Sequence, residues 1–128
     1  MGKNPLERLN EIAQVIYDKK GSNILALDVR GLSSITDYLL IAEGNVDRHV
    51  TAIAKAIVAE LKGKGETPFH TEGLQNGDWV VIDCSEIVIH IFMPSLRGIY
   101  SLERLWDDSK LVDLNIDITK AGSVEADL

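Results

Sequence analysis

Two apolar runs that follow each other almost without interruption restrict the fold of this chain more than any other feature. They comprise residues 79–83 (Trp-Val-Val-Ile-Asp) and 87–93 (Ile-Val-Ile-His-Ile-Phe-Met), and only Cys84-Ser85-Glu86 separates them. β-Branched and aromatic residues on both sides of so short a connection predict an antiparallel hairpin. Because few polar residues alternate with the apolar ones, we expect both strands to be central in a sheet and covered on both faces.

The segment that follows Asn4 is predicted to form the first helix. Asn4 can act as the N-cap, Pro5 takes the first helical position, and Glu7 stands where a capping box needs an acid. Gly21 is expected to end the helix in the left-handed conformation. Apolar residues three and four positions apart form one stripe: Leu6, Leu9, Ile12, Ala13 and Ile16.

A second, longer helix is predicted between two glycine-containing segments. Gly44-Asn45 precedes it and is expected to cap it, while Gly63 and Gly65 end it. Charged residues of this helix, such as Lys55 and Lys62, can face water. Its buried stripe is expected to consist of Val46, Val50, Ile53, Ala54, Ile57, Val58 and Leu61.

Further short elements complete the predicted fold. They are strands at 24–29 and 37–43, an edge strand at 67–71, and a short helix at 101–106 that Ser101 caps. The order of elements predicts a single α/β domain, whose mixed sheet of about five strands is flanked by helices.

The C-terminal end differs in composition from the rest of the chain. Residues 113–128 contain four acids, one lysine and few large apolar groups, without a clear period. We therefore expect a domain of residues 1–114 and an acidic, flexible tail of residues 115–128.

Composition and charge restrict the partners. The chain is 45% hydrophobic and 26% charged, as in soluble globular proteins, and no apolar run is long enough to span a bilayer. A formal charge of -7 argues against a broad phosphate-binding surface; it suits a basic protein partner and equally suits plain solubility. The N-terminus lacks the apolar core of a signal peptide, and the sole cysteine, Cys84, fits a reducing compartment. We expect a cytoplasmic protein without membrane contact.

Few residues have the spacing that catalysis or metal binding needs. The chain has no glycine-rich phosphate loop, no nucleophile-elbow serine and no Cys-x-x-Cys pair. His49, His70 and His90 stand on different elements without ligand-like spacing, so we expect no metal, no cofactor and no enzyme activity. His90 is interpreted as a hydrogen-bonded core histidine, and Cys84 as an inert thiol.

One group of residues supports an enzymatic alternative. A strand that ends at Gly44-Asn45, with Asp47 at the start of the next helix, loosely resembles the loop of nucleotidyltransferases. Those enzymes need two carboxylates to hold two metal ions at a triphosphate. Here His49 stands two residues after Asp47, and a second carboxylate would have to come from elsewhere, such as Asp83. Capping of the helix by Asn45 and Asp47 is the simpler interpretation.

Three stretches together resemble the ribosomal silencing factor (RsfS/Iojap) family over about residues 5–114. The first is residues 28–38 with the continuation 41–50, the second is Glu72-Gly73 with residues 77–83, and the third is residues 88–94 with Arg97 and residues 100–106. Some positions depart from the family pattern. The family often has Gln where His49 stands, commonly His in place of Met93, and a charged residue with an aromatic in place of Gly98-Ile99.

The resemblance implies a function outside catalysis. Family members bind the large ribosomal subunit through ribosomal protein L-fourteen and sterically block the small subunit, which represses translation; organellar relatives act in ribosome biogenesis. The family fold resembles nucleotidyltransferases without their active site, and isolated members crystallise as dimers. For this chain it implies L-fourteen as the partner, with a minor contact to ribosomal RNA and a homodimer as a state of the free protein.

The residues expected to bind the partner cluster around the hairpin and the final helix. Trp79 and Tyr100 are expected at the interface, whereas Phe92 on a central strand is expected in the core. For Trp106, core and interface remain open, and Arg97 suits an RNA phosphate, a partner's acid or a neighbouring acid. Asp37 and Asp83 suit either a basic partner or a turn at a strand end. The complete predicted set is Trp79, Tyr100, Trp106, Arg97, Leu102, Asp37 and Asp83.

Overall fold

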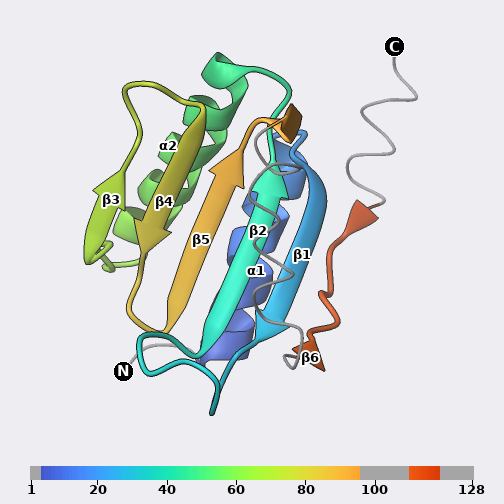
Figure 1. Ribbon diagram of the computed structural model, residues 1–128, viewed down its shortest axis with the longest axis vertical. Coiled ribbons are helices and arrows are strands. Elements are labelled where there is room, and N and C mark those ends of the chain that lie inside the picture. Colours follow the sequence, from blue (N-terminus) through green and yellow to red (C-terminus); the bar gives the residue numbers. More distant parts are fainter. Residues whose placement is uncertain (1–3, 96–109, 119–128) are drawn as a thin grey trace.

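A computed structural model describes residues 4–95 and 110–118 of the chain, which form two layers (Figure 1). One layer holds the helices α1 (Pro5–Asp18) and α2 (Asp47–Gly63). The other is a six-stranded sheet in the order β3-β4-β5-β2-β1-β6. Its strands are β1 (Ser22–Asp28), β2 (Tyr38–Glu43), β3 (His70–Glu72), β4 (Trp79–Asp83), β5 (Ile87–Phe92) and β6 (Lys110–Leu111).

The sheet is mixed, as predicted for this α/β fold. β4 and β5 form the expected antiparallel hairpin, in which Trp79 pairs with Phe92 and Asp83 with Val88. β5 then runs parallel to β2, and this pairing is the only parallel one among the described strands. β3 lies at one edge beside β4, as predicted, whereas β6 at the other edge was not predicted.

Helix α1 begins as the sequence predicts but ends differently. The Asn4 side chain accepts a hydrogen bond from the Glu7 backbone N–H, and the Glu7 carboxylate accepts one from the Asn4 N–H, which completes the capping box. The left-handed residue after the helix is Lys20, with φ of 69°, not Gly21. Gly21 is required for a different reason, because a Cβ there would collide with the side chain of Ile16.

Helix α2 begins at Asp47, and the predicted cap by Asn45 is wrong. Val46 is the N-cap residue, without a side-chain hydrogen bond to the helix. It was predicted in the buried stripe, yet it is 48% exposed because it precedes the helix. Asn45 contributes its backbone N–H instead, which donates to Nδ1 of His49 over 2.8 Å.

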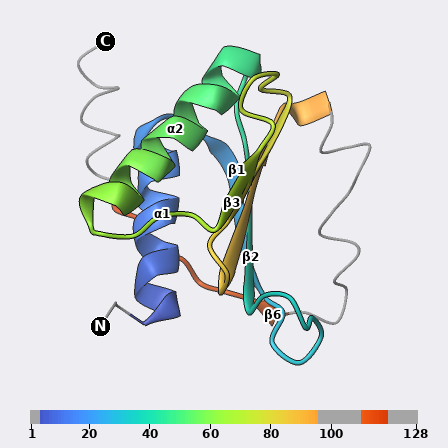
Figure 2. The same cartoon turned by 90° about the vertical axis from the view of Figure 1, so that its left-hand side faces the viewer.

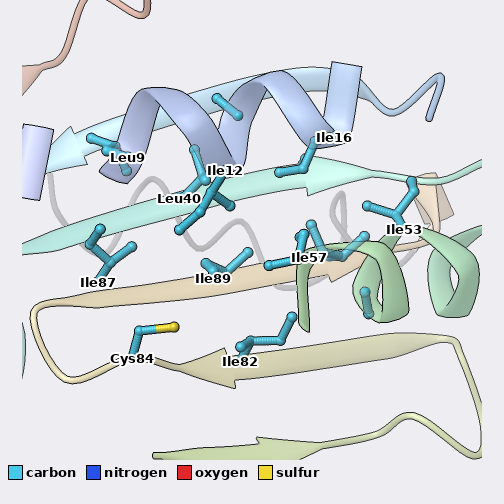
Figure 3. Close-up of a cluster of buried hydrophobic side chains, with 14 of the residues drawn as sticks. Leu9, Ile12, Ile16, Leu40, Ile53, Ile57, Ile82, Cys84, Ile87 and Ile89 are labelled. Carbon is cyan, nitrogen blue, oxygen red and sulfur yellow. The ribbon is translucent and has the colours of Figure 1, made fainter. Parts of the chain in front are cut away.

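The main core lies between the helices and the sheet (Figures 2 and 3). Side chains from α1 and α2, such as Ile12 and Ile57, meet Leu40 and Ile89 from the central strands. Cys84 is buried at the edge of this core, and burial raises the pKa of its thiol to about 11. The thiol therefore stays protonated at neutral pH, which is consistent with the predicted inert role.

Both described helices cover the same face of the sheet (Figure 2), and the β4 side chains on the other face are only half-buried. The expectation that β4 is covered on both faces is therefore wrong. Along β4, buried residues alternate with half-buried ones. Every residue of β2 is buried, and β5 is less buried than β2 but more buried than β4.

Across the described residues, no helix is long and apolar enough to cross a membrane.

The segment after β6 returns to α1. Val112, Leu114 and Ile116 are partly buried against the main core. The backbone N–H of Asn115 donates to Asn10 Oδ1 over 2.6 Å, and that of Asp117 donates to Gln14 Oε1 over 2.7 Å. The first residues of the predicted tail therefore contact α1, and the boundary between domain and tail stays a prediction.

Candidate functional site

The face of the sheet opposite the helices, called the second face below, carries its own apolar cluster. This cluster draws residues from β1, β2, β4 and β5 and from the residue that follows β1. Its buried members are Leu27, Val29, Leu39, Ile41 and Phe92, and its partly buried members are Leu25, Trp79 and Val88. The second face is thus apolar in its middle and half-buried toward β4.

Trp79, the first residue of β4, is a half-buried ring fixed in one position. Its Nε1–H donates to Nδ1 of His90 over 3.1 Å. The ring also lies edge-on to Phe92, with centroids 6.0 Å apart and planes at 66°. A ring held by polar and aromatic contacts such as these loses little further freedom on binding, which is the property of an interface anchor.

His90 supports Trp79 only in its neutral form. Because Nδ1 accepts the bond from Trp79, the neutral ring carries its proton on Nε2. Burial lowers the pKa of His90 to about 4, so the ring is uncharged at neutral pH. The predicted hydrogen bond of His90 is confirmed, but the residue is only partly buried and so is not the core histidine that was expected. Its link to Trp79 was missed, although the hairpin register places them diagonally, since Trp79 pairs with Phe92 and His90 with Val81.

Two glycines set the path of the chain into β4. Gly73 has φ of 86°, and a Cβ there would collide with the carbonyl oxygen of Trp79. Gly77 has φ of 72°, and a Cβ there would lie 2.5 Å from the carbonyl oxygen of Asp47. The backbone N–H of Gly77 also donates to the carbonyl of Gly73 over 2.9 Å. Only glycine fits both positions, so the loop fixes β4 and Trp79 relative to α2.

The predicted residues Asp37 and Asp83 lie at the other end of the sheet. Asp83 ends β4, and its Oδ1 accepts from the backbone N–H of Ser85 over 2.8 Å. Asp37 precedes β2, and its backbone N–H donates to the carbonyl of Glu86 over 3.1 Å. The β4–β5 turn therefore brings these two residues to the same end, away from Trp79. Asp83 is thus a turn residue, and its role in partner binding stays a prediction.

Four predicted residues cannot be placed relative to this site. Arg97, Tyr100, Leu102 and Trp106 fall within residues 96–109, outside the described part of the chain, as does the predicted helix at 101–106. Of the predicted set, the structure thus places Trp79, Asp37 and Asp83, and it brings only the last two together.

The carboxylates that the enzymatic alternative needs are far apart. The carbonyl of Asp47 packs near Gly77, at the end of β4 where Trp79 lies, whereas Asp83 lies at the opposite end. Oδ1 of Asp47 accepts from the backbone N–H of Arg48 over 2.7 Å. Within residues 4–95 and 110–118, no group of three His, Cys, Asp or Glu side chains can hold a metal ion. Asp47 and Asp83 therefore do not form the required pair.

His49 connects the two helices. Its Nδ1 accepts from the backbone N–H of Asn45, and its Nε2 lies 2.7 Å from the carbonyl of Lys19. The neutral ring with its proton on Nε2 makes both bonds. A glutamine amide also offers one acceptor and one donor. The glutamine of the family pattern at this position is therefore chemically compatible with the same connection.

Comparison with known proteins gives one consistent result. A family model described as "Ribosomal silencing factor during starvation" matches residues 3–127, which includes most of the predicted tail. A Bacillus subtilis protein named ribosomal silencing factor RsfS is 39% identical over 103 residues, covering 80% of this chain and 87% of the relative. A mouse protein named "Mitochondrial assembly of ribosomal large subunit protein 1" is 28% identical, covering 77% of this chain and 44% of that protein.

Two solved structures are similar in fold. A crystal structure of a protein from Bacillus halodurans aligns with a TM-score of 0.75 and 33% identity, covering 84% of this chain and 98% of that one. A crystal structure of a protein from Chromobacterium violaceum aligns with a TM-score of 0.76 and 27% identity, covering 88% and 93%. The α/β architecture is therefore shared with proteins from two bacteria.

Proposed function

Because this chain belongs to the ribosomal silencing factor family, we propose that it binds ribosomal protein L-fourteen on the large subunit and sterically blocks the small subunit. A partner on the large subunit is supported by the mouse relative, whose name concerns assembly of that subunit in mitochondria. The proposed action takes place in the cytoplasm and needs no chemical step, since occupation of the joining surface is sufficient.

The observation that carries this proposal is the fixed, half-buried ring of Trp79 beside an apolar cluster. Protein interfaces draw most of their binding free energy from a few rigid aromatic or arginine anchors. Trp79 is held by His90 and Phe92 before any partner arrives, so little side-chain entropy remains to be lost.

The overall charge is compatible with a basic partner. The formal charge of -7 attracts a positively charged protein over a distance of about a Debye length and accelerates the encounter. The partly buried members of the cluster on the second face, Leu25, Trp79 and Val88, then provide the short-range contact. In this division of roles, charge mainly sets the association rate, and the anchor mainly sets the dissociation rate.

Replacement of the anchor tests the proposal. We expect Trp79→Ala to weaken binding to purified large subunits by about fivefold to a hundredfold, or roughly 1–3 kcal/mol. The matched control is Phe69→Ala, because Phe69 is an exposed aromatic (81%) that precedes the edge strand β3. Affinity is measured by sedimentation with the subunits, and circular dichroism must show an unchanged fold in both variants.

The control defines the outcomes. Equal affinities for a folded Trp79→Ala variant and the wild-type chain would remove Trp79 from the interface. A comparable loss in the Phe69→Ala variant would instead move the interface toward the β3 edge.

A further inference from the structure

We propose that the outward ridge of α2 is a second contact surface, which binds phosphate groups of ribosomal RNA. This inference rests on the proposed function, because it takes the large subunit as the partner. The ridge consists of the five exposed residues that follow one line along the helix: Arg48, Ala52, Lys55, Ala59 and Lys62.

The ridge has charge of one sign only. Its three cations stand seven residues apart, so they share one side of the helix at intervals of about 10 Å. The positions between them are alanines, and the acids of this helix, Asp47 and Glu60, stand off the line. A row of cations without acids is unexpected in a chain with a net charge of -7.

The ridge cations take no part in the ion pairs found among the described residues. Lys64, at the end of the same helix, bonds to Glu11 and Glu60 at 2.9 and 3.0 Å. Arg8 and Arg30 likewise have carboxylate partners. Nothing in residues 4–95 and 110–118 gives Arg48, Lys55 or Lys62 such a partner, so their charges are available for an external anion.

A shallow depression adjoins the first half of the ridge. Its volume is about 600 Å³, and Arg48, Thr51 and Lys55 line one side of it. The loop that leads to β4 lines the other side with the exposed amides of Gln75 and Asn76. Asp47 also lies at its rim. Guanidinium, ammonium and amide donors are the groups that proteins use to contact nucleic-acid backbones.

The side chains of the ridge favour RNA over an acidic protein. A protein interface needs apolar or aromatic anchors, and the uncharged positions of the ridge are only alanines. Phosphate contacts need cations and close approach, which alanine permits. Because the rest of the chain is acidic, the contact would be confined to this ridge and would involve only about three phosphates.

The ridge and Trp79 serve different contacts. α2 covers one face of the sheet, while Trp79 belongs to the cluster on the second face (Figure 2). Loss of one contact should therefore leave the other intact, and their failures can be told apart.

A charge-matched pair of triple variants tests the ridge. One combines Arg48→Gln, Lys55→Gln and Lys62→Gln, and the control combines Lys19→Gln, Lys20→Gln and Lys110→Gln at other exposed positions. Both variants lose three positive charges. Binding to purified large subunits is measured across a series of salt concentrations, because each phosphate contact adds about 0.7–0.9 to the slope of log K against log salt.

We expect the ridge variant to bind at least about tenfold more weakly at low salt, with a slope smaller by about two. The control variant should keep the wild-type slope, and Trp79→Ala should lose affinity without a change of slope. An unchanged slope in the ridge variant, or an equal change in the control, would overturn the proposed RNA contact of the ridge. The proposed function would not be affected. Failure of the wild-type chain to bind large subunits would overturn both.

A photo-crosslink identifies the partner chemically. Ala59→p-benzoylphenylalanine places the probe on the exposed ridge between Lys55 and Lys62 without removing a charge. On large subunits, the adduct should be sensitive to ribonuclease. An adduct that only protease degrades would show a protein at the ridge and contradict the RNA assignment.

Discussion

Gly73 and Gly77 occupy places where the backbone of another segment leaves no room for a side chain. At Gly73 the obstacle is the carbonyl of Trp79, and at Gly77 it is the carbonyl of Asp47 together with Thr51 Oγ1. Both glycines also have a positive φ. The position of the proposed anchor thus depends on two residues that have no side chain.

Gly73→Ala should therefore lower the free energy of unfolding by at least about 2 kcal/mol, from the positive φ and the collision together. The control is Gly63→Ala, at the last residue of α2, where a Cβ meets nothing within 4 Å. We expect that control to change stability by less than about 1 kcal/mol, in the stabilising direction. Urea denaturation measures the free energy of unfolding of both variants. Equal values would show that the loop accommodates a side chain at position 73 without loss of stability.

His90 gives the protein a pH-dependent stability. Its pKa is about 4 in the folded chain against 6.5 ordinarily, so the unfolded chain binds more protons between these values. The stability present above pH 6.5 should fall as the pH drops toward 4, by up to about 3 kcal/mol. His90→Gln keeps an acceptor for Trp79 but cannot titrate, so this part of the pH dependence should be absent. Identical pH profiles for both proteins would contradict the assignment.

At the scale of elements, local patterns could be predicted and long-range pairings could not. The capping box of α1 and the β4–β5 hairpin depend on residues close in sequence, and both are confirmed. The parallel pairing of β5 with β2 joins strands separated by α2, β3 and β4, which no periodicity reveals. β6 has only two residues, too few for any pattern.

The segment after β6 gives a prediction at this scale. Deletion of residues 113–128 should cost about 2–4 kcal/mol of stability, because Leu114 and Ile116 leave the core and at least three hydrogen bonds to α1 are lost. Deletion of residues 119–128 alone should cost little, since they include few large apolar residues. Thermal or urea unfolding of both truncated chains checks this. Equal stabilities of the two truncated chains would mean that residues 113–118 do not stabilise the fold through α1.

At the scale of the whole molecule, the two faces of the sheet differ. α1 and α2 cover one face, and the second face carries the cluster that includes Trp79 (Figure 2). The sequence predicted Trp79 as an interface residue from its chemistry, but it did not predict which face it occupies. The charge pattern predicted that Lys55 and Lys62 can face water. It did not predict that they form one ridge with Arg48, because that alignment follows from the geometry of the helix.

Steric exclusion requires that the chain shift the subunit equilibrium by mass action, without turnover. The most direct measurement is sedimentation of separated ribosomal subunits that are allowed to join in the presence of excess protein. We predict a larger fraction of free subunits, with the protein in the large-subunit peak and displaced by excess small subunits. Trp79→Ala, at the same concentration, should leave more subunits joined. Binding to joined ribosomes as tight as binding to free large subunits would contradict steric exclusion.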